Sequence, residues 1–267
     1  MQFICVTCGT QHAESADPPA HCAICEDERQ YVGLDGQKWT TLDELRRGHA
    51  NEVIAAEPGL HEIHTEPQFG IGQRAFLLRT SDGNLLWDCV SLLDDTALDV
   101  IRGAGGLRGI AISHPHYYTT MLDWSAAFGH CPIYLHEADR RWVMRPGDAL
   151  EFWSGESRSL FGGLQLVRCG GHFAGGTVLH WRDAVEGRGA LLSGDTVQVV
   201  PDRRWVSFMY SYPNYIPLGA ADVERIVEAL EPFAFERIYG AFPKMTVEHD
   251  AKSVLQRSAE RYLRAIG

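Results

Sequence analysis

The sequence predicts a mixed α+β fold in which a small cysteine-rich module precedes one large domain. Short apolar runs of strand length alternate along the chain with longer segments of helical spacing. Four of the seven cysteines fall within the first 25 residues. With 267 residues, the chain is long enough for one large core and a small appendage. We place the module at 1–40, a connector at 41–59 and the large domain at 60–267.

Composition and charge disfavour several classes of function. The apolar content of 45% and the charged content of 22% are ordinary for a globular protein. A net charge of −11 argues against binding to nucleic acid or to an anionic membrane, since both need basic patches. The chain begins without a signal-peptide pattern, and no run approaches the roughly 20 apolar residues of a transmembrane helix. We expect a cytoplasmic protein that acts on a small molecule, as a monomer or a dimer.

The N-terminal module contains two C-x-x-C pairs, Cys5 with Cys8 and Cys22 with Cys25. This spacing is typical of a zinc ribbon or rubredoxin-like knuckle with four thiolate ligands. Two disulfides or free thiols are the alternatives, and without a secretory signal the thiols should stay reduced. All four positions are cysteine, so no position is open for a substrate and the site is expected to be structural. We expect zinc, and four thiolates suit iron as well.

The first elements after the module are a short helix, a hairpin and a second helix. Thr41 to Glu44 fits a capping box and begins a helix that ends near Gly48. Apolar runs over 74–80 and 85–90 flank an Asp-Gly turn, which predicts a β-hairpin. The remaining expected elements are helices over 94–103, 119–128, 219–229 and 247–266, strands over 109–112 and 131–136, and paired short strands over 146–163.

Two histidines, His114 and His116, follow the short buried strand at 109–112. On an extended end their imidazoles would point the same way, because side chains in a strand alternate between faces. Pro115 lies between them and ends the strand. Two fixed imidazoles can bind a metal such as zinc. Two solvated loop histidines are the alternative.

Two further strand ends carry polar side chains of the same kind. His172 lies between glycine pairs, after the apolar run 164–167 and before another, and glycines let a loop approach a ligand closely. Asp195 follows a third buried run, 190–194. Three separate strands therefore end in residues that commonly bind metals.

These motifs together resemble the metallo-β-lactamase fold superfamily, in its glyoxalase-like hydrolase branch, over roughly residues 60–267. They are SHPH at 113–116, GGHFAGGTVLHW at 170–181 and LLSGDT at 191–196. The resemblance implies an αββα sandwich, in which two sheets pack face to face with helices outside.

The second metal site of that superfamily is incomplete in this chain. The superfamily pattern after the first strand is His-x-His-x-Asp-His, and its last two positions are occupied here by Tyr118 and Thr119. The region of the last superfamily histidine reads Tyr-Gly-Ala-Phe at 239–242. The resemblance therefore implies a single metal ion, zinc or iron. Its ligands would be His114, His116, His172 and Asp195.

The resemblance implies a metal-dependent hydrolase of a small ester, thioester or lactone-like substrate, using a single metal-activated water. Asp195, Tyr118 and Thr119 are the candidate catalytic residues, although the two hydroxyl groups are not strong bases. Four protein ligands would close a tetrahedral zinc, unless its coordination expands or Asp195 does not bind it directly. Two alternatives remain open. One is a mononuclear iron oxygenase or redox enzyme; the other is a non-catalytic member that binds a ligand or partner through the aromatic segment 205–217.

Overall fold

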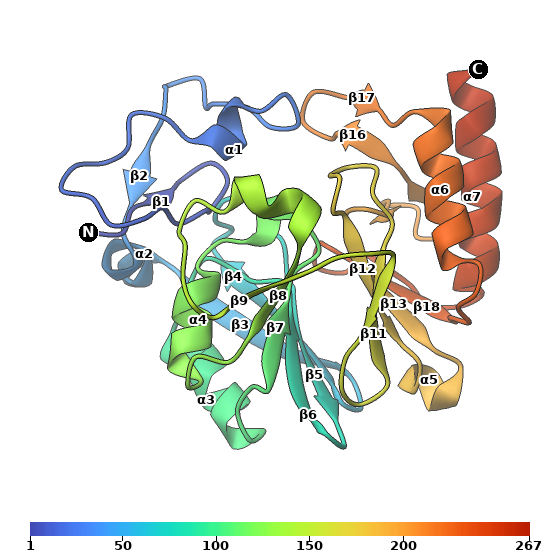
Figure 1. The fold of residues 1–267 in the computed structure, drawn as a ribbon, viewed down its shortest axis with the longest axis horizontal. Coiled ribbons are helices and arrows are strands. Elements are labelled where there is room, and N and C mark those ends of the chain that lie inside the picture. The colour runs from blue at the N-terminus through green and yellow to red at the C-terminus, as the bar shows by residue number, and fades with distance from the viewer. The chain divides into compact units, whose positions relative to one another are not determined.

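A computed structural model describes residues 1–267 (Figure 1). The chain divides into two compact units. The first comprises Met1–Leu135 and Arg140–Phe152, and the second comprises His136–Asp139 and Trp153–Gly267. Each unit contains one large β-sheet and helices of its own. None of the helices combines the length and the apolar character that crossing a bilayer requires.

The first unit is built on a seven-stranded sheet with the strand order β3-β4-β5-β6-β7-β8-β9. Strands β3 to β6 pair antiparallel, whereas β7 runs parallel to β6 and to β8. The predicted hairpin is β5–β6, and Gly83 in its turn has a φ of 126°, which favours glycine. The strands are β3 Ala50–Glu57, β4 Leu60–Glu66, β5 Ala75–Thr80, β6 Gly83–Trp87, β7 Gly109–Ala111, β8 Ile133–His136 and β9 Leu150–Trp153.

Two helices of this unit begin at side-chain caps, and the first of these caps was predicted. Glu44 N donates to Thr41 Oγ1 at 3.3 Å, and Thr41 N donates to Glu44 Oε2 at 3.1 Å, so the predicted capping box is present. Asp94 caps the next helix by accepting a hydrogen bond from Ala97 N. The helices are α1 Ala23–Glu26, α2 Leu42–Gly48, α3 Asp95–Gly103 and α4 Met121–Ala127, with 3-10 turns at Pro115–Tyr117 and Glu137–Trp142. Two short strands, β1 Ile4–Cys5 and β2 Trp39–Thr40, pair within the module.

Two stretches differ from the sequence-based expectation. The segment 41–59, expected as a connector with one short helix, also contains the edge strand β3, which pairs along its length with β4. Most side chains of β3 are not buried, so its sequence lacks the apolar alternation that marks a strand. The short strands expected to pair with each other over 146–163 are β9 and β10 (Ser157–Ser159). They belong to different sheets, which corrects that expectation.

The second unit contains a six-stranded sheet with the order β10-β11-β12-β13-β18-β19. Strands β13 and β18 are parallel, and the other neighbours are antiparallel. Besides β10, its strands are β11 Leu164–Arg168, β12 Thr177–Trp181, β13 Ala190–Gly194, β18 Arg237–Gly240 and β19 Thr246–Val247. Two small hairpins follow β13, formed by β14 Gln198–Val199 with β15 Val206–Ser207 and by β16 Met209–Ser211 with β17 Ile216–Pro217.

Two long helices, α6 (Ala220–Leu230) and α7 (Ala251–Ile266), lie side by side in the second unit (Figure 1). Their apolar faces join a core with the sheet. The short helix α5 (Ala184–Gly187) connects β12 to β13. The closing helix begins later than the predicted 247. Thr246–Val247 pairs with β18 instead, and Asp250, with a φ of 54°, precedes the helix.

Candidate metal centres

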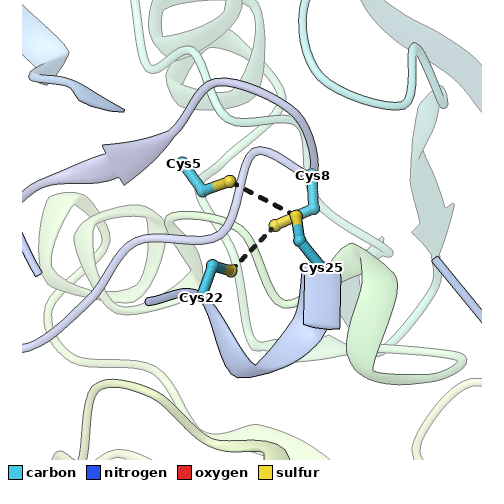
Figure 2. A group of neighbouring side chains, drawn as sticks. All are labelled: Cys5, Cys8, Cys22 and Cys25. Atoms are coloured by element: carbon cyan, nitrogen blue, oxygen red, sulfur yellow. Dashed lines mark hydrogen bonds between the residues drawn. The ribbon is translucent and has the colours of Figure 1, made fainter. Parts of the chain in front are cut away.

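The four cysteines of the N-terminal module point toward one another (Figure 2). Cys5 and Cys8 belong to the turn at the end of β1, and Cys22 and Cys25 to the beginning and body of α1. All four are buried, and their Sγ atoms lie within 4.8 Å of one another. The Sγ atoms of Cys5 and Cys25 are 3.5 Å apart, and those of Cys8 and Cys22 are 3.6 Å apart.

These distances fit four ligands of one metal ion. A disulfide would bring two sulfur atoms to about 2.0 Å, and all seven cysteines are free. Four thiolates at about 2.3 Å from a tetrahedral zinc would lie roughly 3.8 Å from one another. Hydrogen bonds from Cys25, Cys5 and Cys8 lower the pKa of the Cys22 thiol, whereas burial raises the pKa of Cys8 well above its usual value. A cation would replace the protons that such a cluster otherwise shares.

His114 and His116 lie directly after β7 in the first unit. His114 is extended, with a φ of −169°, but Pro115–Tyr117 form a 3-10 turn. The expectation that both histidines extend the strand is therefore wrong for His116, because Pro115 at the first position of the turn starts helical backbone instead. The two rings still lie together. Their centroids are 5.1 Å apart, both side chains are buried, and their ligand nitrogens lie within 4.8 Å.

A buried hydrogen-bond chain sets the tautomer of His114. Asp88 Oδ1 lies 2.7 Å from Ser113 N and 2.8 Å from Ser113 Oγ. An ionised carboxylate only accepts hydrogen bonds, so the Ser113 hydroxyl donates its single proton to Asp88. Ser113 Oγ, 2.9 Å from His114 Nδ1, then accepts the Nδ1 proton. Nε2 of His114 is consequently the deprotonated nitrogen, which is the form that binds a metal.

Replacement of Ser113 by alanine is expected to weaken metal binding at the histidines by about 10- to 100-fold, because the group that orients His114 is lost. The measurement is a competition titration against a chromogenic chelator. Ser258→Ala serves as the control, since the buried Ser258 hydroxyl accepts a hydrogen bond from Val206 N and contacts neither histidine. Equal affinities for wild type and Ser113→Ala would contradict the orienting role.

His172 and Asp195 belong to the second unit. His172 Nδ1 lies 3.2 Å from Met209 O and 2.9 Å from Tyr210 O. Carbonyl oxygens only accept, so Nδ1 carries a proton, and in the neutral imidazole Nε2 is then the nitrogen that can bind a metal. Nε2 lies 3.8 Å from Asp195 Oδ1. This separation is long for a hydrogen bond, but both atoms can reach one ion at ligand distances of about 2.0–2.2 Å.

The glycine-rich loop that carries His172 is fixed by Asp139, which sequence reasoning missed. Gly175 N donates to Asp139 Oδ1 at 3.0 Å. A Cβ at Gly175 would lie 2.7 Å from Asp139 Oδ2, so only glycine permits this close approach. Asp139 has no local motif. The only signal in the sequence is that this carboxylate follows strand β8 closely. The structure shows that it is buried.

The aromatic segment 205–217 supports both His172 and Asp195. Strand β16 supplies the two carbonyl groups that accept from His172. The Tyr212 hydroxyl donates to Asp195 O at 2.8 Å, and its ring centroid lies 5.7 Å from that of His172. Burial, together with the charge of Asp195, raises the pKa of Tyr212 well above its usual value, so the phenol remains a donor. Tyr215, by contrast, is 85% exposed.

The two remaining candidate catalytic residues, Tyr118 and Thr119, follow the turn that contains His116. Both side chains are buried. Thr119 has a φ of 35°, a left-handed conformation that β-branched residues rarely adopt, and its buried hydroxyl has no hydrogen-bond partner within the protein. Strained backbone and an unsatisfied hydroxyl group commonly mark functional positions.

No protein-family model matches the chain. A relative from Bacillus subtilis strain 168, described as the uncharacterized protein YmaE, is 52% identical over 266 residues. The matched region covers 99% of this chain and 96% of YmaE. The chain belongs to the YmaE family.

Solved structures resemble the fold of this YmaE-family chain. DIM-1 metallo-β-lactamase matches with a TM-score of 0.61 at 14% identity, covering 80% of this chain and 98% of DIM-1. TMB-1 matches with a TM-score of 0.61 at 15% identity, covering 82% and 99%. FIM-1 metallo-β-lactamase from Pseudomonas aeruginosa, in a mono-zinc form, matches with a TM-score of 0.58 at 16% identity, covering 80% and 96%. The YmaE-family chain has the metallo-β-lactamase fold, which confirms the predicted fold class and its N-terminal four-cysteine cluster.

Proposed function

We propose that this YmaE-family protein is a metal-dependent hydrolase that uses one metal ion, zinc or iron, at its histidine site. The ligands would be His114, His116, His172 and Asp195. The observation that carries the proposal is the hydrogen bonding of His114 and His172. In both residues a partner of Nδ1 favours the neutral tautomer whose Nε2 can bind a metal. Both histidines are also buried beside a second candidate ligand.

The identity of the residues after His116 supports one ion rather than two. Tyr118 and Thr119 occupy the positions at which the superfamily pattern has Asp and His. Neither a phenol nor an alcohol commonly binds zinc. The mono-zinc form of FIM-1 indicates that the same fold accommodates a single zinc.

A divalent ion at such a site lowers the pKa of a bound water and polarises a substrate carbonyl, which suits a small ester, thioester or lactone-like substrate. The residues of this chain would orient the reactants. The Asp195 carboxylate would accept a hydrogen bond from the attacking water. The buried Thr119 hydroxyl would donate to the water or the substrate, and Tyr118 would line the same position. Tyr212 would hold Asp195 in place through its backbone carbonyl.

We also propose that the four cysteines hold a structural zinc, and that the protein acts on a small molecule in the cytoplasm without a nucleic-acid or membrane partner. All four cysteines are buried, which leaves no open position for a substrate. The net charge of −11 supports the absence of those partners.

The test combines elemental analysis of the full-length chain with a panel of esters, thioesters and lactones. We expect two zinc ions per chain and turnover of at least one class. Iron at the histidine site with oxygen or thiol chemistry would favour the redox enzyme instead. A metal-loaded protein that turns over nothing, yet binds a metabolite tightly, would overturn the hydrolase in favour of a non-catalytic binding protein.

A further inference from the structure

A segment of the N-terminal module lies against the loop that follows the two histidines. We name residues 9–12 the strap and residues 114–120 the histidine loop; both belong to the first unit. Gln11 N donates to Thr119 O at 3.1 Å. The Ser91 hydroxyl donates to Gly9 O in the strap at 2.9 Å. The Thr120 hydroxyl in the loop donates to Ser91 O at 3.0 Å. The strap therefore contacts the backbone of the loop directly and the Thr120 hydroxyl through Ser91.

The conformation of the strap follows from the cysteine module. Cys5 N donates to Thr10 O at 2.9 Å, and His12 N donates to Phe3 O at 2.8 Å. Gln11 also forms an isolated β-bridge with Ile4, next to Cys5. The strap is thus a continuation of the fold around the four cysteines, and its position is set by that fold.

A side-chain network fastens the strap to helix α4, which follows the histidine loop. Gln11 Nε2 donates to Asp123 Oδ2 at 2.8 Å. Arg145 Nη1 donates to Asp123 Oδ1 at 2.6 Å and also to Gln11 Oε1. Gln11 is buried, and the two charged partners are partly buried. Hydrogen bonds to charged groups in such surroundings are among the stronger ones in proteins.

The strap contacts Thr119, whose backbone conformation is strained. Thr119 is β-branched and has a φ of 35°. Such a conformation persists only where the surrounding contacts over-determine it. The hydrogen bond from Gln11 N to Thr119 O is one of these contacts, and it acts three residues after His116.

We propose that Gln11 is a positioning residue for the histidine site. Its side chain anchors the strap on Asp123 and Arg145, and the strap holds the backbone at Thr119. This fixes the direction of the His116 ring and of the Thr119 hydroxyl. The proposal rests on the proposed function in one respect, namely that the histidines bind a metal ion.

The experiment compares Gln11→Ala with Lys38→Ala in the 267-residue protein. Lys38 belongs to the same module, but its exposed side chain pairs with Asp35 and contacts neither the loop nor a cysteine. Hydrogen exchange of residues 114–124 is followed by mass spectrometry, and zinc affinity at the histidines by chelator competition. For Gln11→Ala we expect about tenfold faster exchange confined to the loop and about tenfold weaker zinc binding, with the cysteine-bound metal retained. Lys38→Ala should change neither.

Unchanged exchange and affinity in Gln11→Ala would overturn the proposal. Equal changes in both variants, or faster exchange throughout the first unit, would also overturn it, because Gln11 would then contribute only to general stability. Should Gln11→Ala fail to fold, Asp123→Asn, which keeps the side-chain size but loses the charge beside Arg145, should produce a smaller change of the same kind. Absence of zinc at the wild-type histidines would refute the proposed function, and the exchange comparison would still decide the role of Gln11.

Discussion

Substitution of His116 by alanine is expected to abolish hydrolysis and to remove one metal ion per chain, while the cysteine-bound metal stays. His116 is buried beside His114, so its substitution would remove one of the four proposed ligands. A catalytic metal stabilises the transition state by several kcal/mol, and each 1.4 kcal/mol corresponds to a factor of ten in rate. We therefore expect kcat/KM to fall at least about 10³-fold. Elemental analysis and steady-state kinetics measure the two effects.

The matched control is His130→Ala, since His130 is an exposed loop histidine that should leave both quantities unchanged. Full turnover in His116→Ala would rule out the hydrolase and the iron redox enzyme together, because both depend on the same ligand. Loss of the metal with loss of a tightly bound metabolite, in a protein without turnover, would identify a binding site instead.

Substitution of Cys22 by alanine is expected to release the metal of the N-terminal module and to unfold that module. Three buried thiols would remain beside an empty ligand position, and a metal site of this type contributes its binding energy to folding. Loss of a structural metal belongs to the most destabilising class of single substitutions, so we expect a loss of more than about 4 kcal/mol. Urea unfolding measures the loss of stability, and elemental analysis measures the metal content. Limited proteolysis before residue 40 shows whether the module has unfolded.

Cys131→Ala provides the comparison for the effect of removing a thiol. Cys131 is buried and lies outside the four-cysteine cluster. Its substitution should cost about 1 kcal/mol, the typical value for a point mutation, and should leave the metal in place. Retention of both metal and stability in Cys22→Ala would mean that the cluster is not a metal site.

The sequence predicts those parts of the histidine site that are marked by a pattern of residues adjacent in the chain. A buried apolar run followed by a histidine or an aspartate marks His114, His172 and Asp195, and the glycine pairs around His172 mark a tight loop. The two C-x-x-C pairs are equally local. Pro115 was expected to end the strand, but β7 ends at Ala111, and Pro115 instead begins a 3-10 turn that contains His116.

The parts that could not be predicted depend on contacts between distant residues. Asp88 precedes Ser113 by 25 residues and reaches it from a left-handed backbone, with a φ of 59°. Asp139 likewise meets Gly175 only in the folded unit. Gln11 contacts Asp123, 112 residues away. Strand β3 was missed for a different reason, because an exposed edge strand has few apolar residues to reveal its period.

The three cysteines outside the module allow the reactivity of the four cluster thiols to be measured separately. Burial raises the pKa of Cys131 to about 11 and that of Cys169 to about 12, and it raises the pKa of Cys89 well above the usual value. Alkylating reagents attack the thiolate, so these three side chains remain inert near neutral pH. If the four N-terminal cysteines hold the proposed metal, the thiols that react rapidly would come from these four, and only after the metal has left. Counting labelled sulfur atoms consequently measures the metal occupancy of one site without interference from the other.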